Sequence, residues 1–197
     1  MERTTRQWAS ISRVLLAVVV AVGGCGFDSG LHGVAVEPPR ELPTFAFTRA
    51  DGSVYRTGAE ADRPMVVFFG YTHCPDVCPT TLMDWKRVKQ ELGKNASRVR
   101  FVFVTVDPER DSRDVADTYA KQFDASFVGL SGDSATTARM QEAFGVASMQ
   151  ESSTSAAGYL MSHSSQVFLV DPRGRLIVLY AFGTGWDALL ADLKQLL

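Results

Sequence analysis

The feature that most constrains the fold is a pair of cysteines placed directly behind an apolar run of strand length. Residues 65–70 read Met-Val-Val-Phe-Phe-Gly, and a continuous apolar run of this length is typical of a strand that is buried on both faces. Cys74 and Cys78 follow at once. Pro79 fits the first position of a helix, where a missing backbone N–H costs nothing, so we expect Cys78 at the N-cap and Cys74 on the incoming loop.

The remaining apolar periodicity extends this strand–cysteine–helix unit into a mixed sheet. Strand, helix and strand in succession imply a right-handed parallel crossover, and a late hairpin across Asp-Pro-Arg-Gly adds an antiparallel edge. We therefore predict an α/β, thioredoxin-like fold: a mixed central sheet flanked by helices, with an N-terminal β-hairpin at residues 45–57. Further strands are expected at residues 99–106, 127–130, 166–170 and 176–180, and helices at 80–92, 112–123, from 134 to a stop at Gly145, and from 186 onward.

Residue spacing also predicts what the helices bury and where a loop lies. Trp85 and Phe144 are assigned to the core. The helix at 112–123 places Val115, Tyr119 and Phe123 at i, i+4 and i+8 along one stripe. Residues 146–162 are rich in Ser, Ala and Gly and have no apolar period, so we expect a loop long enough to have a function.

The N-terminal region has the plan of an export signal. In residues 1–25, a segment with three arginines precedes an apolar run that is too short to span a bilayer, and two glycines lead to Cys25. The end of this segment resembles a bacterial lipobox, in which the cysteine is acylated and becomes the mature N-terminus. A plain signal peptide cut near Ser29 is the alternative. Residues 26–41 contain Gly, Pro and charges without apolar period, so we predict a flexible tether.

Bulk composition leaves room for one domain, expected at residues 42–197. The hydrophobic fraction of 46% and the charged fraction of 21% are ordinary for a globular protein. The formal net charge of -2 gives no reason to expect nucleic acid, or an acidic membrane held by charge, as a partner. Three cysteines are an awkward number for an exported protein. Lipidation of Cys25 would leave Cys74 and Cys78 as the remaining pair. Such a pair either forms a disulfide for part of the protein's life or has its sulfurs occupied by a bound group.

The two cysteines suit either nucleophilic attack or metal binding. Both sulfurs lie near the positive end of the predicted helix dipole, which favours the thiolate that either chemistry requires. Thioredoxin-type reductases have two residues between their cysteines, whereas three separate Cys74 from Cys78. Two thiolates are soft ligands suited to Cu(I), and a third, imidazole ligand also tolerates Cu(II). A structural zinc site would normally need a fourth protein ligand.

Three histidines are available as the third ligand. His32 lies in the predicted tether and is expected to be solvated. His73 adjoins Cys74 and is expected to point away from its sulfur. His163 precedes the strand at 166–170, and in a thioredoxin-like sheet the loop before that strand faces the cysteine loop. The alternative without a function is that His163 is a surface residue of a mobile loop. Met161 could supply a weak axial thioether, although core packing is the better interpretation.

Three ordered motifs resemble the Sco/SenC family over a region from about Leu42 to the C-terminus. They read YTHCPDVCP from residue 71, VDPERD from residue 106, and SHS from residue 162 followed by VFLVDPRG. Members are thioredoxin-fold copper-binding factors for respiratory oxidase assembly, so the resemblance implies an assembly factor rather than an enzyme, with Cys74, Cys78 and His163 as copper ligands. Ser162 departs from the acidic residue that many members carry before the histidine.

Two acidic residues near the motifs are candidates for contacts around the ligands or with a partner. Asp76 lies between the cysteines, and Asp107 ends a neighbouring predicted strand. A loop turn and a helix-start acid are at least as good explanations for them.

The resemblance implies a metallochaperone that delivers copper to the CuA site in subunit II of cytochrome c oxidase. The domain would be lipid-anchored at the outer face of the bacterial cytoplasmic membrane, where an upstream copper donor or a thiol reductant would serve it. A thiol-disulfide reductase that keeps the acceptor cysteines reduced would use Cys74 and Cys78 but not His163. A thiol peroxidase is weaker, because peroxiredoxins have Thr where Tyr71 stands. The sequence does not exclude a redox or copper sensor.

Overall fold

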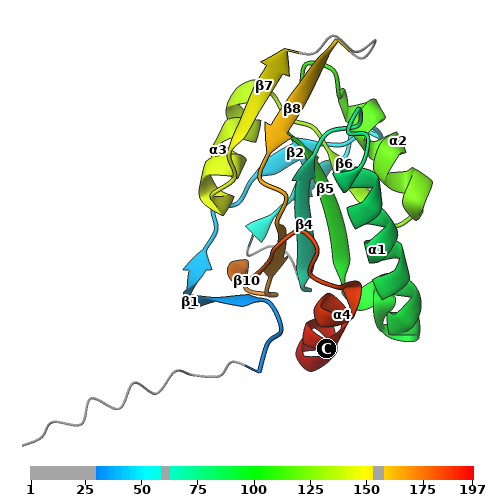
Figure 1. Ribbon diagram of the computed structural model, residues 1–197, viewed down its shortest axis with the longest axis vertical. Helices are drawn as coiled ribbons and strands as arrows, with labels where there is room; N and C mark the ends of the chain where they lie inside the picture. The colour runs from blue at the N-terminus through cyan, green and yellow to red at the C-terminus, as the bar shows by residue number, and fades with distance from the viewer. Residues whose placement is uncertain (1–29, 59–62, 153–157) are drawn as a thin grey trace, which may run out of the picture.

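The computed structural model describes residues 30–58, 63–152 and 158–197, and these form a mixed sheet of six strands with helices on both faces (Figure 1). Strands β4, β5 and β6 run parallel, whereas β9 pairs antiparallel with β4, and β10 and β1 continue the antiparallel edge. This arrangement confirms the predicted fold class. The strand order across the sheet is β1 (Val34–Glu41), β10 (Arg175–Tyr180), β9 (Val167–Val170), β4 (Met65–Gly70), β5 (Arg100–Thr105) and β6 (Val128–Leu130).

Strand β4 lies between β5 and β9, and every one of its residues is buried, as its apolar run predicts. Phe68 and Phe69 point to opposite faces of the sheet. Phe68 meets the ring of Trp85 at 6.3 Å between centroids, and Phe69 meets the ring of Phe144 at 5.2 Å. Burial of both partners confirms the core assignment of Trp85 and Phe144, and apolar burial of this kind is the main stabilising term of the fold.

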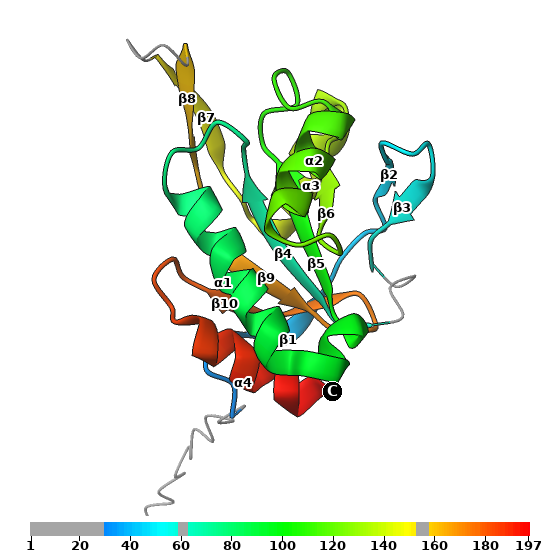
Figure 2. The same cartoon turned by 90° about the vertical axis from the view of Figure 1, so that its right-hand side faces the viewer.

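Helices cover the two faces unequally (Figure 2). Contacts with Trp85 and with β5 and β6 place α1 and α2 on the same face, where α4 packs against α1, whereas α3 covers the other face through Phe144. Gly145 ends α3 in the left-handed conformation, as expected. The bounds are Val77–Leu92 for α1, Arg113–Phe123 for α2, Ser134–Phe144 for α3 and Trp186–Leu196 for α4, and a 3₁₀ segment, Gly93–Arg98, follows α1.

The face that α2 buries differs from the predicted stripe. Val115 is 40% exposed, and the helix instead buries Ala116 and Ala120, while Tyr119 packs only partly into the core. Gly129 of β6 explains the difference, because a Cβ there would lie 2.0 Å from the carbonyl oxygen of Ala116. Close backbone contact with β6 selects small side chains, so the alanine face packs inward rather than the bulkier one.

The predicted tether is wrong for its second half, because residues 34–41 form β1 at the edge of the sheet, antiparallel to β10. Two prolines and a register shift between Ala35 and Arg40 hide the strand from the sequence pattern. Proline cannot donate to a ladder, but it is tolerated on an edge strand. His32 is not simply solvated either: its backbone N–H and Nδ1 both contact the buried carboxylate of Asp192, at 2.9 Å and 2.7 Å.

The predicted long loop is also largely wrong, because much of it forms a second ribbon. Strands β7 (Ser148–Ser152) and β8 (Tyr159–His163) pair antiparallel, with Ser148 opposite His163. This ribbon stands at the top of the molecule in Figure 1. Its strands are mostly polar and not fully buried, so they lack the apolar alternation that predicts a strand.

The hairpin predicted at residues 45–57 is confirmed as β2 (Ala46–Thr48) and β3 (Val54–Arg56). Residues 1–29 lie outside the described part of the chain, and with them lie the predicted signal peptide and Cys25. Within the described residues, no helix is long and apolar enough to cross a membrane.

Candidate metal centre

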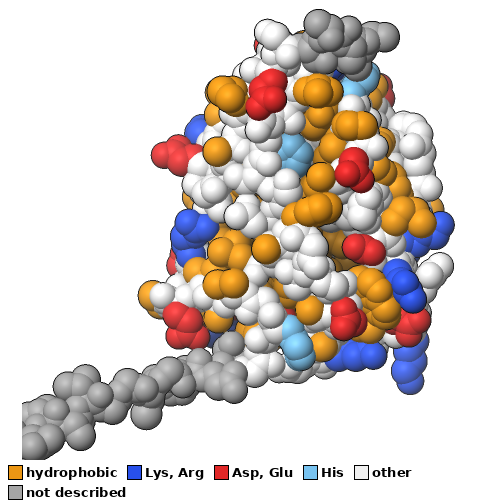
Figure 3. Space-filling model, viewed as in Figure 1, with side chains coloured by type: hydrophobic (Ala, Val, Ile, Leu, Met, Phe, Trp, Pro, Cys, Tyr) orange, Lys and Arg blue, Asp and Glu red, His pale blue; other side chains and the backbone are white. Residues whose placement is uncertain are grey.

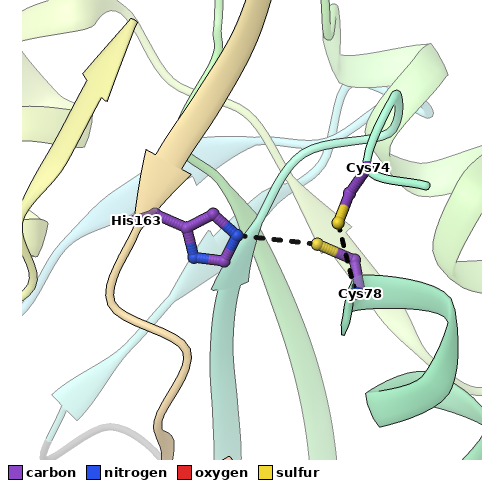
Figure 4. Close-up of side chains that lie close together, drawn as sticks. All are labelled: Cys74, Cys78 and His163. Atoms are coloured by element: carbon purple, nitrogen blue, oxygen red, sulfur yellow. Dashed lines mark hydrogen bonds between the residues drawn. The ribbon is translucent and has the colours of Figure 1, made fainter. Parts of the chain in front are cut away.

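Three segments meet at the carboxyl end of β4: the loop after this strand, the first turn of α1 that follows it, and the end of β8, which is distant in sequence (Figure 4). They bring Cys74, Cys78 and His163 together, with one donor atom from each within 4.8 Å of the others. Cys78 Sγ lies 3.7 Å from His163 Nε2. These are the three residues that the resemblance implied as ligands, and their two sulfurs and one imidazole nitrogen suit a soft metal ion.

Helix α1 begins at Val77, two residues earlier than predicted, so Cys78 is not its N-cap. The N-cap is Asp76, whose carbonyl accepts a hydrogen bond from the backbone N–H of Thr80 at 3.1 Å. Cys78 is therefore inside the first turn, where its own backbone N–H points toward the Cys74 sulfur at 3.4 Å. The Asp76 side chain makes no capping hydrogen bond, so the sulfur of Cys74 takes the position of a capping acceptor.

The two cysteines share one proton unequally. The pKa of Cys74 is lowered from 9.0 to about 4, chiefly by a hydrogen bond from the Cys78 thiol, with further help from the backbone N–H groups of Asp76 and Cys78, and against the effect of burial. The pKa of Cys78 is raised by that same hydrogen bond, by burial and by the charge on Cys74. At neutral pH the half-buried Cys74 is thus the thiolate, and the buried Cys78 keeps the proton.

The imidazole of His163 is oriented by its backbone and by two aromatic rings. Its Nδ1 donates to the carbonyl oxygen of Ser164 at 3.0 Å, because a carbonyl can only accept. Nε2 therefore keeps its lone pair on the side of the cysteines. The rings of Phe68 and Tyr71 meet the imidazole edge-on, at 5.9 Å and 6.0 Å between centroids. Met161 packs against the hydrophobic core, as the better of its two interpretations expected.

Gly70 makes room for the Cys78 sulfur, a role that the sequence did not reveal. A Cβ at this position would lie 2.8 Å from Cys78 Sγ and 2.9 Å from the rings of Phe68 and Phe103. Any larger residue would therefore displace the sulfur or the rings. The available signal was a glycine that ends an otherwise bulky apolar strand.

Asp111 anchors the cysteine loop and is the second residue that sequence reasoning missed. Its buried carboxylate accepts hydrogen bonds from the Thr72 backbone N–H at 2.9 Å, from the Thr72 hydroxyl at 2.6 Å and from the Thr105 hydroxyl at 2.6 Å. The acid that closes the VDPERD motif was the signal for it. His73 lies on this side too, with Nδ1 3.8 Å from the Asp111 carboxylate, and it is not part of the donor cluster found among the described residues.

Asp107 and Asp76 do not bring a carboxylate to the donor cluster. Asp107 is buried and accepts hydrogen bonds from Arg110 Nε and from the Tyr159 hydroxyl, the latter at 2.8 Å. The Arg110 guanidinium lies 3.5 Å from the centre of the Tyr159 ring and donates to the Tyr159 carbonyl oxygen at 2.9 Å. Asp107 thus fixes the start of β8, the strand that ends in His163. Asp76 is exposed and contributes its backbone N–H beside Cys74.

A thioredoxin-like sheet with two cysteine sulfurs and one imidazole at the end of its central strand defines a dithiol protein of metal-binding or redox type. Its fold and ligand spacing agree with the motifs read from the sequence. The chain belongs to the SCO1/SenC family, whose family model matches residues 35–197.

Solved structures and curated relatives agree with this assignment. The apo Sco1 protein from Thermus thermophilus is 39% identical, with a TM-score of 0.75, over 85% of this chain and 97% of that one. Bradyrhizobium japonicum ScoI, solved with copper bound, is 33% identical, with a TM-score of 0.71, over 80% of this chain and 99% of that one. A SCO2-like protein of Rickettsia prowazekii is 30% identical over 66% of this chain, and the match spans 64% of its own length.

Proposed function

We propose that this protein is a copper metallochaperone that delivers copper to the CuA site of cytochrome c oxidase subunit II. The observation that carries the proposal is the approach of one nitrogen and two sulfur donors, from Cys74, Cys78 and His163, to within 4.8 Å of one another. The similar ScoI of B. japonicum was solved with copper bound. The described residues place no carboxylate in this cluster, so its donor set favours copper over hard cations such as Mg²⁺ or Ca²⁺.

Copper is the cargo of such a protein, and the site suits its exchange. Cys74 is half-buried and already a thiolate, so it can bind a metal ion without first losing a proton. The buried Cys78 and the half-buried His163 would hold the other side of the ion. Three donors leave a coordination position through which an acceptor thiolate can enter before a donor ligand leaves, so the ion passes between proteins without being released to water.

A thiol-disulfide reductase is the second candidate, and the lowered pKa of Cys74 favours it. The Cys74 thiolate would attack an acceptor disulfide, form a mixed disulfide and release one acceptor thiolate. Cys78 would then lose its proton and attack Cys74, closing the Cys74–Cys78 disulfide and releasing the second acceptor thiolate. The two electrons come from the cysteine pair, which an external thiol reductant must reduce again.

Copper binding by the purified, reduced protein tests the proposal. We expect one copper ion per chain, with X-ray absorption showing two sulfur neighbours and one nitrogen neighbour. Bound copper should also raise the melting temperature as its concentration rises, by mass action. Absence of sulfur scattering, or stoichiometric binding that Cys78→Ser does not weaken, would overturn the assignment of the ligands.

The proposal includes a location at the outer face of the bacterial cytoplasmic membrane, with a lipid anchor at Cys25. Gly30, the first described residue, lies beside the C-terminal helix, where its carbonyl accepts a hydrogen bond from Gln195 at 2.9 Å. In Figure 1 this end of the domain is opposite the β7–β8 ribbon. An anchor that reaches the domain there leaves the metal centre facing away from the membrane, where an acceptor can approach it.

A further inference from the structure

A groove opens beside the metal centre, between the first turns of α1, the start of β9 and the loop that joins β10 to α4. Its volume of about 110 Å³ suits one side chain, since pockets for drug-sized ligands measure roughly 300–1,000 Å³. Aromatic and aliphatic groups form most of its wall, and Asp84 is the one charged residue among those that line it. The lining is Thr80, Thr81, Asp84, Trp85, Ser165, Val167, Tyr180, Ala181, Phe182, Gly183, Thr184, Gly185, Trp186 and Leu189.

Two of the residues that line the groove are close neighbours of metal-centre residues. Thr81 lies one helical turn after Cys78, and Ser165 donates a hydrogen bond to the carbonyl oxygen of His163 at 3.3 Å. The face drawn in Figure 3 carries many hydrophobic side chains, and it is the face on which α1 and the end of β8 lie in Figure 1. A protein that exchanges a metal ion with Cys74, Cys78 and His163 must therefore cover this neighbouring surface as well.

Two aromatic side chains on the rim of the groove are exposed enough to contact a partner. Phe182 is 53% exposed, although it is large and apolar, which is common at protein interaction sites. Trp186 is partly exposed, and the guanidinium of Arg87 lies 4.4 Å from the centre of its ring. Arg87 is thus positioned over Trp186 rather than in a hydrogen bond with Asp84.

Asp84 gives the groove a charge preference. Among the described residues, no donor makes a hydrogen bond to its carboxylate, and burial raises its pKa against the opposing charge of Arg87. A purely apolar side chain inserted here would remove more water from the carboxylate without replacing it, which is unfavourable. A Lys or Arg side chain would instead place its stem against Phe182 and Trp186 and its cation beside Asp84.

We propose that this groove is the docking site for the copper-accepting protein, and that it binds a Lys or Arg side chain which the acceptor presents next to its metal-binding thiolates. The inference rests on the proposed copper delivery and specifies which surface the acceptor recognises. Docking in the groove would hold the acceptor thiolates over the open side of the Cys74–Cys78–His163 cluster while the ligands exchange.

The test measures binding and copper transfer from the copper-loaded protein to the purified metal-free CuA domain of subunit II. The wild type is compared with four variants. We expect Asp84→Lys and Phe182→Ala each to weaken the complex at least tenfold and to slow copper transfer, while copper affinity stays unchanged. Glu91→Lys is the matched charge control, because Glu91 lies exposed further along the same helix, outside the groove. Val54→Ala is the apolar control, because Val54 is 57% exposed on the β2–β3 hairpin.

The outcomes separate the docking site from the function. Copper transfer by the wild type, with undiminished binding by both groove variants, would overturn the docking site and leave copper delivery standing. Equal weakening by Glu91→Lys and Asp84→Lys would indicate long-range attraction instead of the groove. Weakening by Phe182→Ala alone would make the occupant apolar, and a change in the oligomeric state of either groove variant would make it a second copy of this chain. No transfer by the wild type would overturn copper delivery itself.

Discussion

Cys78 Sγ lies 3.7 Å from Nε2 of His163, although the two residues are 85 positions apart in the sequence. The sheet brings them together: β9 pairs antiparallel with β4, with Val167 opposite Phe68. The segment before β9 therefore lies at the same edge as the loop that follows β4. Because this contact depends on the whole fold, loss of His163 should affect metal binding while leaving the local chemistry of the two cysteines largely intact.

His163→Ala should separate copper delivery from thiol reduction. A dithiol can attack a disulfide without an imidazole, so thiol-disulfide exchange in vitro should be retained. The loss of one of three donors should weaken Cu(II) most, by roughly 10–100-fold or more, since even partners of ligands have effects of that size. Cells with the variant should lack CuA absorbance and oxidase activity at limiting copper and recover in part when copper is added.

His73→Ala is the control for this experiment. His73 adjoins Cys74 but is directed toward Thr72 and Asp111, so its loss should leave copper affinity close to that of the wild type. A normal oxidase in His163→Ala cells at low copper would overturn the metallochaperone proposal and favour the reductase.

Gly70→Ala should disturb the metal centre through packing alone. The added methyl group would lie 2.8 Å from the Cys78 sulfur, and overpacking of a buried site costs about 1–3 kcal/mol. We expect a lower melting temperature and weaker copper binding. Gly132→Ala is the control, because its nearest neighbour is a ring atom of Phe47 at 3.1 Å. Unchanged copper affinity in Gly70→Ala would mean that the sulfur can move without loss.

The reduced, metal-free protein should show a stability maximum near the ordinary thiol pKa. Cys74 has its pKa lowered from 9.0 to about 4, so between these values the unfolded chain binds more protons and stability rises with pH. The pKa of Cys78 is raised, so above pH 9.0 the folded chain holds the extra proton and stability falls. Urea unfolding across this range measures the effect, and a Cys74→Ser/Cys78→Ser double variant should lack it. A single thiol titrating near 9.0 in the folded protein would contradict the assignment.

The fold could be predicted to the extent that burial leaves a periodic pattern in the sequence. Strand β4 and the β9–β10 hairpin follow from apolar runs and turn residues, because they lie in or next to the core. Strand β1 and the β7–β8 ribbon could not be predicted, since their residues are exposed or only half-buried and β1 contains two prolines. Their pairing depends on backbone hydrogen bonds, which leave no pattern in the side chains. Helix α2 was given the wrong face because Gly129, on the next strand β6 and outside the helix, decides which face packs inward.

The metal centre was predicted mainly from the family motifs. Spacing and the helix dipole indicated that Cys74 and Cys78 would be reactive, but no local pattern joins His163 to them. Gly70 and Asp111 were missed for a related reason: each acts through a contact that only the folded chain makes. Asp107 was singled out as a residue near the ligands, whereas its contacts are with Arg110 and Tyr159.

Cys25→Ser tests the proposed anchor. If Cys25 carries the lipid, the variant should be released as soluble protein or accumulate as an uncleaved precursor, because the residue that is acylated before cleavage is gone. A single acyl chain holds a protein only weakly at a membrane, so the anchored form should carry more than one. Fractionation of cells and mass spectrometry of the mature N-terminus measure both. Membrane retention of a cleaved Cys25→Ser form would rule the lipid anchor out.

Asp111→Ala should loosen the cysteine loop and shift the chemistry of Cys74. The substitution leaves the backbone N–H of Thr72 and two hydroxyl groups without their acceptor. We expect a loss of about 3 kcal/mol or more, since each of the three unpaired donors costs about 1–3 kcal/mol. A loop freed from this carboxylate no longer holds Cys74 against the N-terminus of α1. The pKa of Cys74 should then move upward toward its ordinary 9.0, which the pH dependence of thiolate absorbance or alkylation measures.

Asp107→Ala is the matched control. Asp107, like Asp111, is buried and follows β5, but it accepts hydrogen bonds from Arg110 and Tyr159 near β8 instead of from the cysteine loop. Its loss should destabilise the β7–β8 ribbon and weaken copper binding through His163, while the pKa of Cys74 stays low. Asp111→Asn should fall between wild type and Asp111→Ala, because an amide oxygen can still accept one of the hydrogen bonds to Thr72. An unaltered pKa of Cys74 in folded Asp111→Ala would show that the helix and Cys78 alone hold the thiolate, and that the carboxylate serves only stability.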